Sequence, residues 1–423
     1  MTVQGEIIAI GDELLCGRVI NTTSSFAARQ LVSAGYSISK ITIIGDKPED
    51  IKKSLLESID RAAFILVTGG LGPTTDDITN EVVADALGLK LVLNEHIMNK
   101  ILAMEKRLGL DHLPMREKLA WLPEGAELLN PEGSAAGYML SYKGIPLFFL
   151  PGVPSELEDH IVNQVLPRME KLMFNKRLVV KQHIFRVFGL QETDINTMFL
   201  DIEPENDDIT IGYYPNFPEV HISVTVKGKD ANNVSKTFTE VCKRVRGLLR
   251  DYIVAEGEET LESVLGNLLR EKDARLSLAE SCTGGLIASR ITRTSGASEW
   301  FDHAVVSYSN SAKENALGVS HDTISKYGAV SYECCMEMLK GVSSKTEYGL
   351  AVTGIAGPSG GSEEKPIGTV YIGLKTPDKY IVEHFWFPGN RNRVQEMTAE
   401  TALDWLRRYL VYGTYVPGYR PVG

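Results

Sequence analysis

This sequence has few cysteines and no long hydrophobic run. The five cysteines are scattered over 423 residues without a CxxC pair, which argues against a disulfide framework and leaves no zinc-binding motif. No apolar run approaches the roughly 20 residues of a membrane span, and the first residues, MTVQGEIIAIGDE, contain no basic stretch like that of a signal peptide. These absences predict a cytoplasmic protein with reduced thiols and no membrane partner.

Positive charge is also in deficit. The 44 lysines and arginines are outnumbered by 55 aspartates and glutamates, for a formal net charge of −11. Nonspecific binding to nucleic acid or to an anionic membrane needs net or clustered positive charge. We therefore expect no nucleic-acid partner, and a phosphate-bearing ligand must be held by local groups.

The first domain is expected over residues 1–168, where apolar strands alternate with amphipathic helices. Strands are predicted at EIIAIGD, KITIIGD, FILVTGG and IPLFFLPG, and the second and third have the continuous apolar pattern of buried parallel strands. Helices are predicted at TTSSFAARQLVSAG and DDITNEVVADALG, the latter capped by Asp76 or Asp77. This alternation is typical of a doubly wound α/β domain.

Two more domains are predicted downstream. Residues 175–252 have the order β-α-β-β-α of a small α+β domain, and the strict alternation in EVHISVTVKG predicts a half-exposed sheet. The acidic segment AEGEETLES resembles a short linker into a new helix. The third domain, over residues 256–412, again alternates strands and helices and is expected to be α/β.

The turn TGGLGPTTDDIT is the most informative stretch of the first domain. It follows a predicted strand, at the carboxyl edge of the sheet where α/β proteins bind ligands. Its glycines allow close approach of a ligand to the backbone, its threonine offers a hydroxyl, and the helix N-terminus that follows suits a phosphate. The residues predicted to contact a ligand here are Gly69, Gly70, Gly72 and Thr74.

Carboxylates in the same turn point to a metal. Asp76 and Asp77 would repel a bare phosphate, so a divalent cation such as Mg²⁺, Mn²⁺ or Co²⁺ between carboxylate and phosphate is predicted. Asp46, at the end of another strand, is a further candidate ligand. The alternative is that Asp76 and Asp77 only cap the helix.

The stretch LAESCTGGLIASRI, residues 278–291, poses a similar question in the third domain. A strand breaks at two glycines into a helix, and Ser281 precedes the glycines as a candidate nucleophile. Further motifs are VVSYSNSAKENALGV, with Tyr308, Asn310 and Lys313 at a strand end, and the glycine-rich TGIAG, followed by a basic helix start at Arg391. Together they suit an anionic substrate with a bond to hydrolyse. The alternative is a helix-capping turn without catalytic role.

Several long motifs resemble, in sequence and in order, the CinA family of competence/damage-inducible proteins. They are AIGDELLCGRVINTTSSFAARQL, TGGLGPTTDD, LPGVPSELE and AESCTGGLIASRIT. The turn TGGLGPTTDDIT by itself is similar to that of molybdopterin-binding domains of the MoaB/MogA type. Two stretches depart from the family pattern: GDELL has Asp12 where GTELL is usual, and PEGSAAGY stands where GTAPG is common.

The resemblance implies two activities. The molybdopterin-binding-like domain is expected to hydrolyse ADP-ribose to AMP and ribose 5-phosphate with a divalent metal, and Glu13 and Asn21 of its first motif are implied substrate contacts. The middle domain resembles a KH module, but FGLQETD lacks the GxxG loop that clamps nucleic acid. A spacer or dimerisation role, and hence a homodimer, is expected instead.

The third domain is expected to deamidate nicotinamide mononucleotide without a cofactor. Ser281 would be the nucleophile and Lys313, with a pKa lowered by burial, its base, because His303, His321 and His384 lie outside the motifs. Tyr308 would orient Lys313 or pass the proton. Cys282 is the rival nucleophile.

The remaining residues of this site are expected to bind the substrate. Backbone amides of one of two glycine turns would form an oxyanion hole, and Arg391 would hold the 5′-phosphate. The predicted binding residues are Thr283, Gly284, Gly285, Asn310, Thr353, Gly354, Ala356, Gly357 and Arg391. The alternative for the whole chain is a non-enzymatic protein, either a molybdopterin-like binder or a DNA-uptake accessory.

Overall fold

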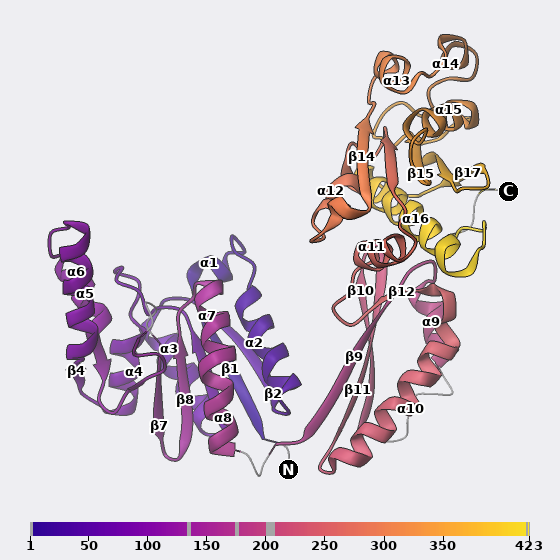
Figure 1. Ribbon diagram of the computed structural model, residues 1–423. Helices are drawn as coiled ribbons and strands as arrows, with labels where there is room; N and C mark the ends of the chain where they lie inside the picture. Colours follow the sequence, from indigo (N-terminus) through magenta and orange to yellow (C-terminus); the bar gives the residue numbers. More distant parts are fainter. Residues whose placement is uncertain (1–2, 133–136, 174–176, 200–207, 420–421, 423) are drawn as a thin grey trace. The chain divides into compact units, whose positions relative to one another are not determined.

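The computed structural model describes residues 3–132, 137–173, 177–199, 208–419 and 422 (Figure 1). The chain divides into two compact units, Met1–Lys181 with Val226–Lys236, and Gln182–Thr225 with Thr237–Gly423. Within the described ranges, no helix has the length and apolar character needed to cross a membrane.

A six-stranded sheet with the order β2-β1-β3-β8-β7-β6 forms the centre of the first unit. The strands β2, β1, β3 and β8 are parallel, whereas β7 runs antiparallel to β8 and β6 antiparallel to β7. The bounds of these strands are β1 (Gln4–Ile10), β2 (Ser37–Ile44), β3 (Phe64–Thr68), β6 (Glu127–Leu128), β7 (Tyr138–Tyr142) and β8 (Ile145–Leu150). A separate pair is formed by β4 (Leu91–Leu93) and β5 (Trp121–Pro123).

Helices cover both faces of this sheet, as a doubly wound fold requires (Figure 1). One buried cluster joins α3 (Pro48–Ile59) and α4 (Thr79–Leu87) to one face of the sheet. A second cluster joins α2 (Thr22–Ser33), α7 (Pro154–His160) and α8 (Leu166–Met173) to the other. The remaining helices are α1 (Asp12–Leu15), α5 (Glu95–Leu108), α6 (Pro114–Glu117) and a π-helical turn at Ile161–Val165.

Two predictions about this unit were wrong. The strand KITIIGD is parallel, but it is an edge strand, so Ile41 and Ile43 are exposed rather than buried. Neither Asp76 nor Asp77 caps a helix, because α4 begins only at Thr79, after Ile78, and has no side-chain cap. The two aspartates lie in the turn before it and remain available for another role.

The middle segment confirms the predicted β-α-β-β-α order. Its elements are β9 (Val179–Val187), α9 (Glu192–Phe199), β10 (Ile209–Asn216), β11 (Glu219–Gly228) and α10 (Ala231–Leu249). The expected linker AEGEETLES was wrong at its start, since β12 (Ile253–Glu256) joins the sheet beside β9 in the order β10-β11-β9-β12. The acidic composition suggested an exposed linker, but the charge of Glu256 is compensated by Arg246 and His183, so this residue can end a strand.

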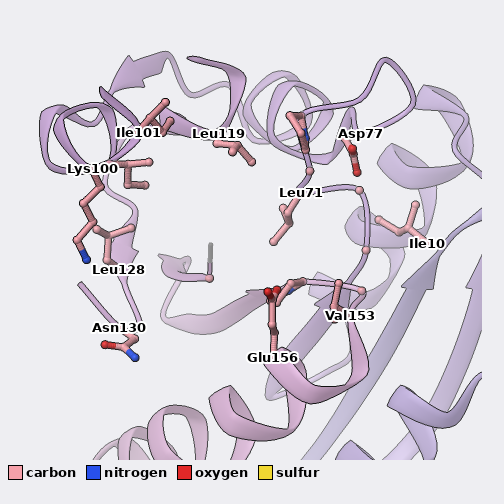
Figure 2. Close-up of a pocket in the computed structure, with 18 of the residues that line it drawn as sticks. Ile10, Leu71, Asp77, Lys100, Ile101, Leu119, Leu128, Asn130, Val153 and Glu156 are labelled. Atoms are coloured by element: carbon pink, nitrogen blue, oxygen red, sulfur yellow. The ribbon is translucent and has the colours of Figure 1, made fainter. Parts of the chain in front are cut away.

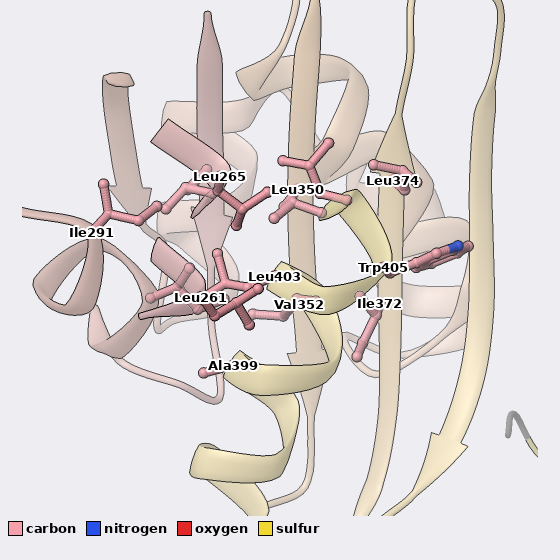
Figure 3. Packing of buried hydrophobic residues seen from close by; sticks show 14 of the residues in the cluster. Leu261, Leu265, Ile291, Leu350, Val352, Ile372, Leu374, Ala399, Leu403 and Trp405 are labelled. Carbon is pink, nitrogen blue, oxygen red and sulfur yellow. The ribbon is translucent and has the colours of Figure 1, made fainter. Parts of the chain in front are cut away.

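A five-stranded sheet with the order β14-β13-β15-β16-β17 forms the third α/β region, and β13, β14 and β15 are mutually parallel. The strands are β13 (Leu276–Glu280), β14 (Phe301–Val306), β15 (Tyr348–Gly354), β16 (Thr369–Lys375) and β17 (Tyr380–Trp386). One face packs against α11 (Leu261–Glu271), α12 (Leu286–Thr292) and α16 (Arg391–Tyr412), and the other against α13 (Asn310–Leu317) and α15 (Tyr332–Val342), with α14 (His321–Tyr327) beside α15. Figure 3 shows the first of these cores, where Leu261 and Leu403 meet Val352.

Candidate active sites

The first unit contains a cavity of about 750 Å³ beside the turn TGGLGPTTDDIT (Figure 2). That volume lies within the range of small-molecule sites. Glycines and acidic residues of the predicted set line one side: Gly69, Gly70, Gly72, Glu13, Asp46, Asp76 and Asp77. Apolar side chains, among them Leu71 and Ile101, line much of the remainder.

The turn requires glycine at two positions, because of its backbone angles and because there is no room for side chains. Gly69 and Gly70 have φ angles of 97° and 66°, which side-chain-bearing residues rarely adopt. A Cβ atom on Gly70 would approach the Thr79 hydroxyl oxygen to 2.2 Å. That hydroxyl donates a hydrogen bond to the Gly69 carbonyl at 3.1 Å, so the turn is tied to the first turn of α4.

The acidic side of the cavity concentrates negative charge around Asp46. Asp46 Oδ2 accepts a hydrogen bond from the Asp12 amide at 2.9 Å. Burial raises the pKa of Asp46, and the neighbouring charges of Asp12, Glu13 and Asp76 raise it further. Asp77 has a different environment, since its carboxylate accepts hydrogen bonds from the amide and hydroxyl of Thr74.

These residues could supply some of the ligands of a cation, but not all of them. In the described ranges no three His, Cys, Asp or Glu side chains converge as a complete metal site. Magnesium, however, is usually held by one or two carboxylates and completed by substrate phosphates and water. Asp46 and Asp76, which line one cavity and repel each other, match that pattern.

Two predicted contacts of this site lie elsewhere. Asn21 is the N-cap of α2, and its side-chain oxygen accepts from the Ser24 amide at 3.0 Å. Thr74 serves Asp77 and does not line the cavity. Of the departing stretch PEGSAAGY, residues 133–136 lie outside the described residues.

A basic side of the cavity was missed by sequence reasoning. His96, Lys100 and Arg107 line it and all come from α5. His96 and Lys100 both contact the carbonyl oxygen of Pro131. No signal in the sequence marked these residues, because basic side chains on an amphipathic helix are ordinarily a solvated face.

In the third region, the structure brings Ser281 and Lys313 together. Lys313 Nζ lies 2.9 Å from Ser281 Oγ and 2.8 Å from the Ser307 carbonyl oxygen. Lys313 is only 2% exposed, and burial lowers the pKa of its amine. In the part of the chain that is described, the amine bonds to a hydroxyl and a carbonyl and to no carboxylate. A buried amine without a counterion is favoured in the neutral form that a general base requires.

Lys313 reaches the serine from a helix rather than from the strand end that was predicted. It lies in α13, whose N-cap Ser309 accepts a hydrogen bond from the Ala312 amide at 3.1 Å. Asn310 is the first, exposed residue of this helix. The cap fixes where α13 begins and thereby directs Lys313, one turn later, under the nucleophile turn.

Glu280, which sequence reasoning missed, organises the nucleophile turn. It is fully buried, and its carboxylate accepts hydrogen bonds from the Thr283 hydroxyl and from the amides of Gly285, Ile287 and Ala288, at 2.7 to 3.1 Å. A carboxylate at this place neutralises the positive end of α12. The only signal in the sequence was its position directly before Ser281, as the one charged residue of the strand LSLAE.

Two of the three amides of the Thr283–Gly285 turn, a candidate oxyanion hole, already have acceptors within the protein. The Gly285 amide donates to Glu280, and the Gly284 amide donates to the Ser281 carbonyl at 3.1 Å. In the second turn, the Ile355 amide donates to Thr369, whereas the amides of Ala356 and Gly357 have no acceptor among the described residues. Those two amides are the better candidates.

Other predicted residues have structural partners. Thr353 donates its hydroxyl hydrogen to the Ala329 carbonyl at 2.7 Å, and Gly354 pairs with Val370 in the sheet. Tyr308 was expected beside Lys313, but its exposed hydroxyl instead accepts from Arg391. Arg391, at the first turn of α16 as predicted, also donates to the Gly357 carbonyl at 2.8 Å.

The rival nucleophile is disfavoured by its surroundings. Cys282 is buried, and burial raises the pKa of its thiol to about 12, so the thiolate is scarce at neutral pH. The histidines also stay apart from Ser281. His303 and His321 form surface pairs with Asp302 and Glu314, and the ring of His384 stacks on that of Tyr371.

A shallow cleft of about 380 Å³ lies on the solvent side of the nucleophile turn. It is lined by Thr283, Gly284, Gly285, Leu286, Ser289, Asn392, Gln395 and Glu396. Gln395 ties α16 to this turn, because its amide nitrogen donates to the Cys282 carbonyl at 2.7 Å. None of the α16 residues of the cleft was predicted, because they reach it only through the packing of α16 against a turn that is distant in the sequence.

Family models match all three regions of the chain. Residues 6–171 match the probable molybdopterin binding domain, residues 182–255 the damage-inducible protein CinA KH domain, and residues 258–410 the CinA C-terminal domain. These matches agree with the fold class predicted from the sequence.

Relatives match over nearly the full length. A CinA-like protein of Desulfotalea psychrophila is 45% identical over 96% of this chain and 98% of its own length. A putative competence-damage inducible protein of a Thermoanaerobacter species is 38% identical, covering 97% of this chain and 99% of the relative. Among solved structures, competence damage-inducible protein A of Klebsiella pneumoniae is 31% identical and covers 36% of this chain and 97% of its own, with a TM-score of 0.35, at which the likeness carries no argument.

Proposed function

Because this chain belongs to the CinA family, we propose that its C-terminal region is an amide hydrolase that converts nicotinamide mononucleotide and water into nicotinate mononucleotide and ammonia. The observation that carries this proposal is the contact of 2.9 Å between the buried Lys313 amine and Ser281 Oγ. A serine hydroxyl attacks an amide only with a base beside it. A protein that merely binds a ligand has no use for a desolvated lysine against a serine.

The residues around this pair have distinct roles in the proposal. Lys313 takes the proton of Ser281 as its oxygen attacks the carboxamide carbon, and the amides of Ala356 and Gly357 bind the resulting oxyanion. Arg391, held by Tyr308 and by the Gly357 carbonyl, binds the phosphate. Tyr308 is thus a positioning residue for Arg391.

The test is release of ammonia from nicotinamide mononucleotide. The purified full chain should release ammonia and nicotinate mononucleotide in equal amounts without added metal. Ser281→Ala should release neither. Release by Ser281→Ala at the rate of the unaltered protein, or none by the unaltered protein, would contradict the proposal.

We propose further that the N-terminal region hydrolyses ADP-ribose to AMP and ribose 5-phosphate with a divalent metal. Support comes from the cavity of about 750 Å³, which combines carboxylates with a basic side and apolar walls. When bound, the metal would neutralise the pyrophosphate and act as a Lewis acid. Asp46 and Asp76 would hold it, while His96, Lys100 and Arg107 suit the phosphates.

The test is AMP formation from ADP-ribose with Mg²⁺, Mn²⁺ or Co²⁺ added in turn after treatment with chelator. Cleavage that continues in excess chelator would remove the metal from the proposal. A DNA-uptake accessory, as the names of relatives suggest, would instead bind DNA and leave ADP-ribose intact.

A cytoplasmic location and a homodimer complete the proposal. All five cysteines are free thiols, which supports a reducing compartment. The exposed Tyr214 on the edge strand β10 supports association through the middle domain. Light scattering of the purified chain tests the dimer.

A further inference from the structure

Ser307 carries a hydroxyl that the interior of the protein leaves without a partner. The residue is fully buried, and in the described part of the chain its Oγ makes no hydrogen bond. Buried hydroxyl groups are nearly always hydrogen-bonded, because an unpaired one has lost its bonds to water without replacement. Such an exception needs an explanation, and one kind is a role in chemistry.

The backbone holds Ser307 against the reacting groups. Its amide donates to the Glu280 carbonyl at 2.8 Å, and its carbonyl accepts from Lys313 Nζ at 2.8 Å. Glu280 and Val306 are register partners on the neighbouring parallel strands β13 and β14. Ser281 and Ser307 each come next along the chain, so their side chains lie on the same face. The Lys313 amine is thus bonded to the hydroxyl of Ser281 and to the backbone carbonyl of Ser307.

The proposed deamidation presents a task for this hydroxyl. Lys313 is bonded at once to Ser281 Oγ and to the Ser307 carbonyl, so the buried amine is fixed on the nucleophile's side. The leaving nitrogen, on the same carbon, needs a proton before it departs as ammonia. The unpaired hydroxyl on the residue whose carbonyl holds the lysine can both receive and donate a proton.

We propose that Ser307 Oγ is the proton relay that expels ammonia, an inference that rests on the proposed deamidase function. As the bond from Ser281 Oγ to the carboxamide carbon forms, the serine proton moves to Lys313 and the carbonyl electron pair moves to oxygen. When that pair returns, the C–N bond breaks with its electrons going to nitrogen. Nitrogen takes the Ser307 proton, and Lys313 returns its proton to Ser307. Water then adds to the acyl carbon, gives its proton to Lys313, and Ser281 regains a proton as its ester bond breaks.

The experiment compares an amide with an ester in the same active site. The phenyl ester of nicotinate mononucleotide releases phenolate, which leaves without a proton. Ser307→Ala should lower kcat for nicotinamide mononucleotide by about a hundredfold or more at unchanged KM, the usual size of a general-acid contribution. It should hydrolyse the phenyl ester at nearly the rate of the unaltered protein, whereas Ser281→Ala should lose both.

Stability supplies the matched control. Removing an unpaired buried hydroxyl should leave the free energy of unfolding unchanged or raise it. Ser343, equally buried, donates to the Leu339 carbonyl at 2.6 Å, so Ser343→Ala should be destabilised yet active on both substrates. Full activity of Ser307→Ala on the amide would overturn the relay. Equal loss on amide and ester would also overturn it, because the hydroxyl would then serve the nucleophile.

Failure of the proposed function is seen in the unaltered chain, whereas failure of the relay is seen in the variant. If the unaltered chain splits the phenyl ester but not nicotinamide mononucleotide, deamidation itself is refuted and the relay falls with it. Failure of the relay alone appears only in Ser307→Ala, with the unaltered chain active on both substrates.

Discussion

The two candidate sites use the same local device in opposite ways. In each, a buried parallel strand breaks at two glycines with positive φ, and a helix follows. In the first unit α4 begins without a side-chain cap, and the carboxylates nearby repel one another. In the third region Glu280 caps α12, and Ser281 is already bonded to Lys313. We therefore expect the first site to be completed by a cation and an anionic ligand, whereas the Ser281–Lys313 pair of the second is formed without either.

The sharpest way to test this comparison is to remove one member of the Ser281–Lys313 pair. Ser281→Ala and Lys313→Ala should each lower turnover of nicotinamide mononucleotide by about a thousandfold or more, and the double variant little beyond that, because the pair acts as a unit. Cleavage of ADP-ribose should be unchanged in all three.

Cys282→Ala is the matched control for the pair, since this neighbour is buried but its thiol is not ionised. It should keep most of its turnover. Activity that is lost in Cys282→Ala and kept in Ser281→Ala would mean that the nucleophile is wrongly assigned. If all of these variants stay active, the turn is only a helix cap.

The corresponding change in the first unit is loss of a carboxylate. Asp46→Asn and Asp76→Asn should each lower cleavage of ADP-ribose by about a hundredfold or more, because the charge stabilisation that a bound metal supplies is worth several kcal/mol. Deamidation should remain intact. Asp85→Asn, which removes an exposed partner of Lys52, should change neither activity. Equal loss of both activities would indicate misfolding instead.

Glu280→Gln tests the preorganisation of the second site. The amide has one acceptor oxygen where the carboxylate has two, so some of the donors of Thr283, Gly285, Ile287 and Ala288 lose their partner. The free energy of unfolding should fall by about 1–3 kcal/mol, with a loss of deamidation that is smaller than that of Ser281→Ala. Glu271→Gln, on the exposed end of α11, is the control in urea unfolding. An unchanged unfolding curve for Glu280→Gln would contradict the assignment.

The smallest expected effect is on pH dependence. Burial lowers the pKa of Lys313 below the ordinary 10.5, so between those two values the unfolded chain binds more protons than the folded one. The free energy of unfolding should therefore rise with pH in that window, and Lys313→Met should flatten the rise. Deamidation should increase with pH until the folded pKa is passed, because only the neutral amine accepts a proton. A rate that falls with pH over this range would exclude Lys313 as the base.

The sequence was a good guide wherever a local pattern carries the physics. Continuous apolar strands followed by glycine turns located both sites, and Ser281 and Lys313 were paired by elimination, since no histidine lay in a motif. Sequence reasoning failed where the burial of a segment depends on which other segments pack beside it. KITIIGD has the composition of a central strand, yet β2 lies at the sheet edge. AEGEETLES resembles a linker, yet its first residues belong to β12, which pairs with β9, and Glu256 is bonded to Arg246 and His183.

By itself, the sequence determined the family, the order of the domains, the two glycine turns and the candidate nucleophile, because each depends on residues close together in the chain. Only the tertiary structure decided that Glu280 uses the turn amides, that Tyr308 holds Arg391, and that α5 brings basic residues to the cavity. It also decided that Ser307 is buried without a partner. Hydrogen bonds and burial arise where distant segments meet, and neither periodicity nor composition records which segments these are.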